Sequence, residues 1–307
     1  MMKTRYAYIH RPFAAMGSPC EIKLYADKRS RAEHVTARLI REVHRLEARY
    51  SRFRADSVLS EINRVAQVGG RITVDAETAG LLNYVDTCYR ESDGLFDATS
   101  GVLRHAWRFS ERQIPASEQI EGLLERIGWH RLRWEAPVLS FPQAGLELDL
   151  GGAVKEYAVD RLASLCWEAG IHHGLINLGG DIKIVGPHPD QSPWRVGITH
   201  PRKPGQYITV LDLAQGALAS SGDYERCIEV EGIRYGHVLN PKTGWPVAYL
   251  ASVSVVSDFC VVAGSASTIA MLKESAGPAW LAQLGLWHHW VTVDGVMGGT
   301  EPAVPAD

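Results

Sequence analysis

The sequence predicts an α+β protein with mixed sheets and packed helices. Apolar residues recur at helical spacing in several long segments, and shorter segments with alternating residues and turn signals lie between them. This mixture of helices and strand meanders is typical of α+β architecture. The 307 residues, 46% of them hydrophobic, can bury a large core, and their number allows one large domain or two smaller ones.

The first expected elements are a strand pair and a long helix. The pair spans Arg5 to Tyr25 with its turn at residues 15–18, and its second half alternates in strand fashion. A helix is expected over residues 31–50 because one apolar stripe runs along it. The stripe consists of Val35, Leu39, Val43 and Leu46.

Two shorter helices should follow, each opened by a capping side chain. Asp56 or Ser57 is expected to cap a helix over residues 58–64. Asp75 is expected to open the second helix, directly after a short strand at residues 72–74.

The next region has weaker patterns. Residues 95–101 are interpreted as a loop and residues 102–107 as a helix. Residues 108–125 are polar and are expected to form a variable surface segment. Residues 129–134 and 138–141 are expected to form a hairpin.

The most informative stretch runs from Leu146 to Asp181. An apolar run ends at Asp149, two glycines follow, and a helical pattern then continues to a C-cap at Gly170. A second apolar run over residues 175–178 ends in another glycine pair. We interpret the stretch as a strand, a glycine turn, a helix, a strand and a second glycine turn.

The first glycine pair, Gly151 and Gly152, opens that helix and indicates an anion site. Glycine lets backbone N–H groups approach an anion, and the helix dipole favours negative charge there. Lys155 lies in the first turn, where the dipole disfavours a cation, so a bound anion or an acid should compensate it. The alternative is a tight connection between two strands with nothing bound.

The last third of the chain is expected to be rich in strands. Strands are expected at residues 194–199, 206–213, 217–221, 250–256 and 290–293, with a hairpin over 227–237 and a turn at 240–244. A helix over residues 259–272 contains a run of small residues, which indicates a closely packed neighbour, and a second helix is expected at 278–284.

Composition argues against several classes of function. The formal net charge of −3 gives no electrostatic basis for nucleic-acid binding. The five cysteines are scattered and contain no CxxC pair, so they are expected to be reduced and mostly buried. No apolar run is long enough for a signal peptide or a membrane span, and no lipobox cysteine occurs, so we expect no membrane insertion and a cytoplasmic location.

Several blocks of the sequence, taken in order, resemble the ApbE-type flavin transferases along nearly the whole chain. The blocks are Met16-Gly17-Ser18, SRFRADSVLSEINR (51–64), GLFDATSGVL (94–103), LDLGGAVKEYAVDR (148–161), INLGGDI (176–182), PWRVGI (193–198), SSGDYER (220–226), RYGHVLNPKTGWPV (234–247) and LASVSVVS (250–257). No single block is specific, but their order and spacing together are.

The resemblance implies that residues 1–307 form a single domain with FAD:protein FMN transferase activity. Such a flavoprotein enzyme moves FMN from FAD to a Thr or Ser hydroxyl of an acceptor protein and releases AMP. The resemblance also implies two subdomains flanking a flavin cleft, with FAD as substrate or bound ligand and Mg²⁺ as the metal cofactor.

The resemblance further assigns residues to the FAD site. They are Met16, Phe53, Leu95, Phe96, Asp97, Asp149, Lys155 and Leu239, the last through its backbone. Without the resemblance, Met16 and Phe53 would be interpreted as ordinary core residues. Asp97 would be interpreted as a helix cap and Lys155 as a solvated surface residue, although a Lys beside a diphosphate also neutralises its charge.

His237 is the candidate catalytic residue. It lies between an expected strand and a turn, within RYGHVLNPKTG, where a rigid element would hold it. Histidine can accept the proton of an acceptor hydroxyl near neutral pH. The alternative is a structural role in the hairpin.

The expected Mg²⁺ site departs from the family pattern. The family usually has Ala-Asp-Ala-x-x-Thr in the helix after LASVSVVS, but this chain has Gly264 at the Asp position. The remaining candidate ligands are the carbonyl of Gly152, the hydroxyl of Thr268, and Ser267, where some members carry a second Asp. Mg²⁺ prefers one or two carboxylates with phosphate and water, so the site is expected to be divergent.

Glu156 is a second departure, because the family usually has Gly after the Lys. Glu156 could supply a carboxylate or equally be an exposed helix residue, and Asp258 could substitute if the strand end is shifted. Two alternatives to transferase activity stay open, a non-catalytic FAD-binding relative and an FAD pyrophosphatase. If the lost Asp limits turnover, Gly264→Asp should raise Mg²⁺-dependent turnover.

Overall fold

The structure of the chain is a computed structural model that describes residues 6–109, 111, 113–224 and 226–300. The strands are β1 (Ala7–Ala15), β2 (Ser18–Ala26), β3 (Gly70–Thr73), β4 (Arg133–Glu135), β5 (Val138–Phe141), β6 (His173–Leu178), β7 (Asp181–Gly186), β8 (Trp194–Thr199), β9 (Tyr207–Leu213), β10 (Ala217–Gly222), β11 (Cys227–Val230), β12 (Ile233–Gly236), β13 (Leu250–Ser257), β14 (Trp287–Thr292) and β15 (Met297–Gly299). The α-helices are α1 (Arg29–Tyr50), α2 (Val58–Val68), α3 (Ala76–Glu91), α4 (Ser117–Leu124), α5 (Val154–Glu168), α6 (Cys260–Leu272) and α7 (Gly277–Gln283). Three 3₁₀ helices are η1 (Ser100–His105), η2 (Trp129–Arg131) and η3 (Glu274–Ala276).

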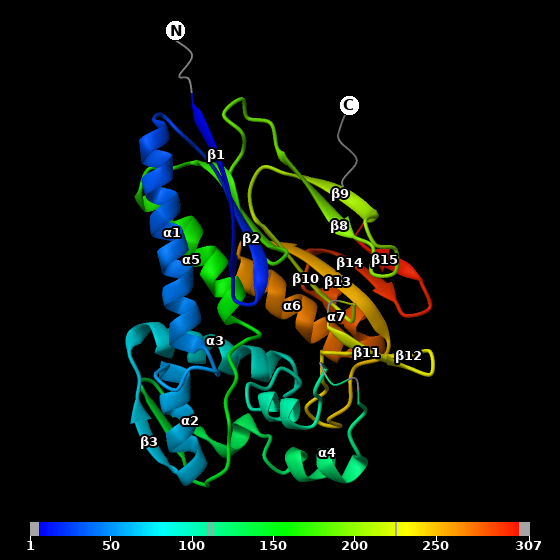
Figure 1. The fold of residues 1–307 in the computed structure, drawn as a ribbon. Helices are drawn as coiled ribbons and strands as arrows, with labels where there is room; N and C mark the ends of the chain where they lie inside the picture. Colours follow the sequence, from blue (N-terminus) through cyan, green and yellow to red (C-terminus); the bar gives the residue numbers. More distant parts are fainter. Residues whose placement is uncertain (1–5, 110, 112, 225, 301–307) are drawn as a thin grey trace.

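The largest sheet has the strand order β1-β2-β6-β7-β10-β13-β14-β15, and each neighbouring pair is antiparallel. Smaller sheets are formed by β3-β5-β4, by β8-β9 and by β11-β12. Figure 1 shows α1, α5 and α6 lying across one face of the large sheet. The predicted α+β class, with several sheets and packed helices, is confirmed.

The large sheet lies between two layers. Because successive strand residues point to opposite faces, neighbouring residues of β6 enter different cores. Ile176 packs into the main core under the helices, whereas Leu175 packs with Trp194 and Leu211 of the β8–β9 ribbon. The sheet is therefore covered by helices on one face and by a two-stranded ribbon on the other.

The helix α1 follows from its apolar stripe. Leu39, Val43 and Leu46 are completely buried, and each buried aliphatic side chain contributes about 1.5–3 kcal/mol relative to exposure. The expected strand pair before it forms as β1 and β2, with Ala15 paired to Ser18 across the turn, while Arg5 lies outside the described residues.

Residues from about 51 to 150 gather at one end of the molecule, below the sheet in Figure 1. This end contains α2, α3, α4 and the small β3-β5-β4 sheet. The two expected subdomains, the flavin cleft between them and the assignment of residues 1–307 to one domain all stay predictions.

The apolar run at residues 146–149 is not a strand, so the interpretation of that segment as a strand is wrong. Its backbone is satisfied by side chains of α2 rather than by a neighbouring strand. Asn63 donates to the Leu148 carbonyl (2.9 Å) and accepts from the Leu148 N–H (2.7 Å), and Gln67 donates to the Leu146 carbonyl (2.9 Å). Backbone groups that find such partners do not need a strand ladder.

Three other expectations need correction. The helix expected over residues 102–107 is the 3₁₀ helix η1, which begins and ends two residues earlier. The polar segment at residues 108–125 contains α4, whose Ile120 is buried beside Leu103 and Trp107. The first strand of the expected hairpin begins later, because Trp129 opens η2 and is held by Asp97 and Asp86.

Several local signals are confirmed. Ser57 caps α2 and Asp75 caps α3, each by accepting a backbone N–H at 2.9 Å. Gly170 closes α5 with a φ of 67°. Among the described residues, no helix combines the length and apolar character that a bilayer-spanning segment requires.

Candidate active site

The glycine turn before α5 lies directly on an aromatic ring. A Cβ at Gly152 would be 3.3 Å from the Phe96 ring, so the backbone comes this close because residue 152 has no side chain. Gly152 is exposed on its other side, and its carbonyl accepts no backbone hydrogen bond from the part of the chain that the structure describes. The predicted FAD residue Phe96 therefore forms the floor of the predicted glycine cradle.

At this cradle, Asp149 contacts residues of three sequence blocks, 51–64, 94–103 and its own block 148–161. Its carboxylate accepts the Gly151 N–H at 2.9 Å and forms an ion pair with Arg52. Asp149 also packs against Gly101, where a Cβ would lie 2.4 Å from the Asp149 Cβ. Sequence reasoning had not assigned a role to Arg52, although it stands beside Phe53 in the SRF block.

Phe53 is exposed beside this ion pair. Its side chain is 84% exposed, and the Arg52 guanidinium lies 4.9 Å from the centroid of its ring. The alternative that Phe53 is a core residue is therefore wrong. An exposed aromatic face next to an anion cradle can stack on a planar ligand.

Lys155 has the acid that its position predicts. Its Nζ lies 2.8 Å from Asp181 Oδ2, and the Asp181 side chain is only 5% exposed. The alternative of a solvated surface lysine is therefore wrong. A Cβ at Gly179 would lie 2.7 Å from Ser18 Cβ and 3.6 Å from Lys155 Nζ, so the two glycine turns and the β1–β2 turn meet at this lysine.

Met16 lies in the β1–β2 turn in a left-handed conformation, with a φ of 51°. Its backbone N–H donates to Glu47 Oε1 of α1 at 2.6 Å, and its side chain is half-buried against the main core. Leu95 is likewise half-buried against this core. Both residues are thus partly accessible and partly packed.

Asp97 has a role within its own loop. Its buried carboxylate accepts the backbone N–H groups of Thr99 (2.7 Å) and Trp129 (3.0 Å) and the Thr99 hydroxyl (2.6 Å). These bonds hold the segment that carries Phe96 under the glycine cradle. The FAD contact assigned to Asp97 stays a prediction.

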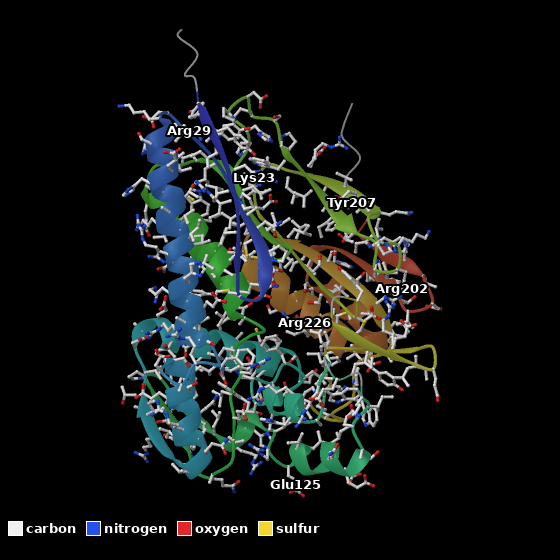
Figure 2. All side chains as sticks on the ribbon, in the orientation of Figure 1. Lys23, Arg29, Glu125, Arg202, Tyr207 and Arg226 are labelled. Carbon is white, nitrogen blue, oxygen red and sulfur yellow. The ribbon has the colours of Figure 1, made fainter. Side chains whose placement is uncertain are left out.

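His237 directly follows β12 and is exposed. The preceding Gly236 packs closely on Asp223, since a Cβ there would lie 2.9 Å from the Asp223 Cβ. Asp223 is in turn held by a two-point ion pair with Arg202, which is labelled in Figure 2, at 2.6 Å for each contact. Leu239 forms an isolated bridge with Pro246. The strand end before His237 is thus anchored, as expected.

The candidate metal ligands on α6 are hydrogen-bonded. Ser267 is fully buried, and its hydroxyl lies 2.9 Å from the Gly264 carbonyl and 2.8 Å from the Ser221 hydroxyl. The Thr268 hydroxyl is less buried and lies 2.9 Å from the same Ser221 hydroxyl. Within the described residues, no group of three or more His, Cys, Asp or Glu side chains could hold a metal ion.

Glu156 is not the exposed helix residue that was one of its two interpretations. It is 8% exposed, and a Cβ at Gly264 would lie 2.5 Å from Glu156 Cγ and 2.9 Å from Glu156 Oε1. Burial, and then the negative charge of Asp181, raise the pKa of the Glu156 carboxyl. The space that a side chain at residue 264 would need is occupied, so Gly264→Asp alone is no longer expected to raise turnover.

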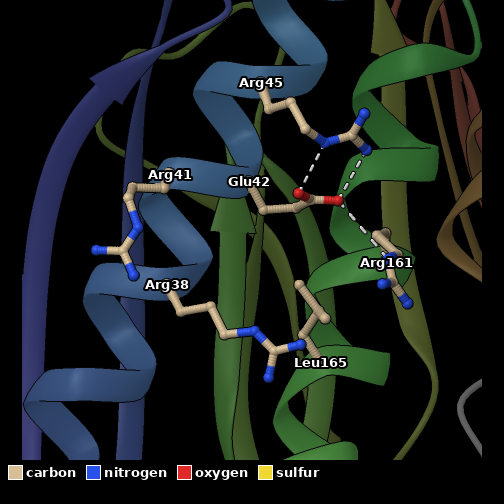
Figure 3. Close-up of a pocket in the computed structure, with 6 residues that line it drawn as sticks. All are labelled: Arg38, Arg41, Glu42, Arg45, Arg161 and Leu165. Carbon is tan, nitrogen blue, oxygen red and sulfur yellow. Dashed lines mark hydrogen bonds and ion pairs between the residues drawn. The ribbon is translucent and has the colours of Figure 1, made fainter.

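A depression elsewhere on the surface does not suit a flavin. It lies between α1 and α5 and is lined by Arg38, Arg41, Glu42, Arg45, Arg161 and Leu165 (Figure 3). Glu42 accepts from Arg45 at 2.9 Å and lies 3.7 Å from Arg161, so an acid of the chain itself partners two of the arginines. Its lining has no aromatic side chain on which a flavin ring could stack.

The fold and this site define an α+β protein in which a glycine turn at a helix start lies next to an exposed aromatic side chain. The chain belongs to the ApbE family, whose model matches residues 16–288. It is 32% identical over 240 residues to the FAD:protein FMN transferase of Chlamydia pneumoniae, covering 76% of this chain and 74% of that protein.

Two solved structures agree with this assignment. The ApbE protein of Thermotoga maritima has a TM-score of 0.87 at 28% identity, covering 96% of this chain and 97% of that one. The apo form of the flavinyl transferase ApbE of Pseudomonas stutzeri has a TM-score of 0.85 at 25% identity, covering 98% and 97%.

Proposed function

We propose that this chain is an FAD:protein FMN transferase, with FAD as the donor and a Thr or Ser hydroxyl of a protein as the acceptor. The observation that carries the proposal is the Arg52–Asp149 ion pair, which places the exposed Phe53 ring beside the glycine cradle. FAD combines a planar flavin with a diphosphate. An aromatic face and an anion cradle side by side match these two groups.

The transfer requires one bond to form and one to break. The acceptor oxygen attacks the phosphorus of the FMN half, a new O–P ester bond forms, and the anhydride P–O bond breaks so that AMP leaves with its electron pair. The hydroxyl proton moves to an imidazole nitrogen of His237, which acts as general base. The exposed position of His237 suits an acceptor as large as a protein.

The chain offers oxygen donors of the chemical type that Mg²⁺ prefers. The candidates are the Gly152 carbonyl, the Thr268 hydroxyl and the buried carboxyl of Glu156, and such hard oxygen ligands suit Mg²⁺. When bound, Mg²⁺ would neutralise charge on the diphosphate. The Lys155 ammonium, held by Asp181, adds positive charge at the same turn.

The test is flavinylation of an acceptor domain. The purified protein is mixed with FAD, Mg²⁺ and a domain that carries the acceptor Thr, and in-gel flavin fluorescence and AMP release are measured. We expect labelling by the native protein, and loss of labelling by at least about a hundredfold in His237→Ala, as for removal of a general base. His34→Ala, at an exposed position of α1, is the matched control.

The same assay separates the alternatives. AMP and free FMN without labelled acceptor would indicate an FAD pyrophosphatase. FAD binding without AMP would indicate a non-catalytic relative and would contradict the transferase proposal.

We also propose that the acceptor is cytoplasmic. All five cysteines, Cys20, Cys88, Cys166, Cys227 and Cys260, are free thiols, which is typical of a reducing compartment. Flavinylation of the acceptor in cells that target this protein to the cytoplasm, and not in cells that export it, would support this location.

A further inference from the structure

The two residues that depart from the family pattern touch each other. Glu156 stands where glycine is usual and Gly264 stands where an acid is usual, and the Glu156 side chain lies over Gly264. We propose that Glu156 supplies the carboxylate ligand of the divalent cation from α5, in place of an acid at residue 264 of α6. This inference rests on the proposed function and deepens its metal site.

The register of α5 against α6 supports the exchange. Asp160 of α5 accepts the N–H groups of Cys260 (2.9 Å) and Val261 (3.0 Å) and so caps the start of α6. Glu156 lies one turn before Asp160 on α5, and Gly264 lies one turn after Cys260 on α6. The two helices therefore run in opposite directions along this contact, and a carboxyl group can reach the same place from either one.

The other candidate ligands follow along the same contact. Gly152 precedes Glu156 by four residues, in the glycine turn just before α5, and Thr268 follows Gly264 by four residues on the same face of α6. Because the two helices are antiparallel, both candidates lie beyond Glu156 and Gly264 in the direction away from the Asp160 cap.

The burial and hydrogen bonding of the Glu156 carboxyl group indicate that it binds a cation. The residue is more than nine-tenths buried, and Oε2 has no hydrogen-bond partner in the described part of the chain. A buried carboxylate without partners is strongly disfavoured unless a cation or donor completes it. The charged groups that face it are Asp181 of β7 and Lys155 and Asp160 of α5. One carboxylate with phosphate and water ligands is enough for Mg²⁺.

Metal affinity tests the assignment without measuring turnover. Mn²⁺ serves as the probe, in the presence of ADP to supply a diphosphate, and free Mn²⁺ is quantified by electron paramagnetic resonance. Glu156→Gln, which keeps the shape and removes the charge, should weaken Mn²⁺ binding by at least about tenfold, since even loss of an outer-shell partner costs about 10–100-fold. Glu168→Gln, at the exposed end of α5, should bind as the native protein does.

A second test moves the acid from residue 156 of α5 to residue 264 of α6, where the family usually has it. The double variant Glu156→Gly with Gly264→Asp should recover Mn²⁺ affinity to within about threefold of the native protein, whereas Glu156→Gly alone should not. The double variant also decides the matter if Glu156→Gln fails to fold. Native affinity in Glu156→Gln, or no recovery in a folded double variant, would overturn the assignment.

The experiment also distinguishes the two proposals. Binding of FAD in the presence of a chelator is followed by quenching of flavin fluorescence. A native protein that binds no FAD would contradict the proposed function. A native protein that binds FAD, but whose Mn²⁺ affinity is unchanged in Glu156→Gln, would overturn only the metal assignment.

Discussion

A methyl group at residue 264 should destabilise this protein, although alanine is normally the better helix residue. A glycine-to-alanine change inside a helix contributes about 1 kcal/mol of stability. Here the new Cβ would lie 2.5 Å from Glu156 Cγ, and overpacking of an interior costs about 1–3 kcal/mol. We therefore expect Gly264→Ala to lower the free energy of unfolding by about 1 kcal/mol, the difference between these two effects.

Removing the Glu156 side chain should turn the destabilising effect of Gly264→Ala into a stabilising one. In a Glu156→Ala background, Gly264→Ala meets no carboxyl group and should raise the free energy of unfolding by about 1 kcal/mol. Urea unfolding of the four proteins, followed by circular dichroism, measures the coupling. Gly80→Ala is the matched control, because Gly80 lies within α3 with nothing near its missing Cβ, and it should be stabilising. Stabilisation by Gly264→Ala in both backgrounds would refute the placement of Glu156.

Three further predictions follow from contacts described above. Asp160→Ala removes a cap from two N–H groups and should lower the free energy of unfolding by about 1–2 kcal/mol in urea titrations, while an unchanged value would contradict the capping role. Arg45 hydrogen-bonds to Glu42 and Glu77 and thereby lowers the pKa of both carboxyl groups, so its stabilisation is present above their ordinary pKa of about 4.3 and is lost as pH falls through the lower folded values. Arg45→Met should therefore lower the melting temperature at pH 7, and the difference should shrink toward pH 3; a constant difference would contradict this. Gly152→Ala places a methyl group 3.3 Å from an aromatic ring and should weaken FAD binding about tenfold in fluorescence titrations, the equivalent of about 1.4 kcal/mol of overpacking.

Local signals were sufficient for much of the fold. The apolar stripe of α1, the caps Ser57 and Asp75 and the closing Gly170 each act within a few residues of the chain, so the sequence contains the whole interaction. The uncompensated position of Lys155 also predicted an acid or anion, and Asp181 is that acid. Such features are predictable because the interacting residues lie close in sequence or, for Lys155, because the helix dipole disfavours a cation without a negative partner.

Features that depend on distant partners were not predictable in this way. The run at 146–149 has the apolar character of a strand, but α2 supplies its hydrogen bonds through Asn63 and Gln67. Glu156 has the polarity of a surface residue, yet it is buried because α6 offers a glycine opposite it. The small residues around Gly264 predicted a closely packed neighbour but not which side chain it is, and Asn63 has the character of an ordinary helix residue, so the packing of the helices is needed to identify the partner of each.

The register that Asp160 sets between α5 and α6 also limits the order in which residues 156 and 264 can change during evolution. In a chain with acids at both positions, the two side chains would have to occupy the same space, since a Cβ at 264 would already lie 2.5 Å from Glu156 Cγ. A chain with glycine at both positions has no such conflict and keeps its helix contact through the cap. Of the two single-substitution intermediates between these arrangements, the glycine–glycine chain is therefore the one without a packing conflict at this contact.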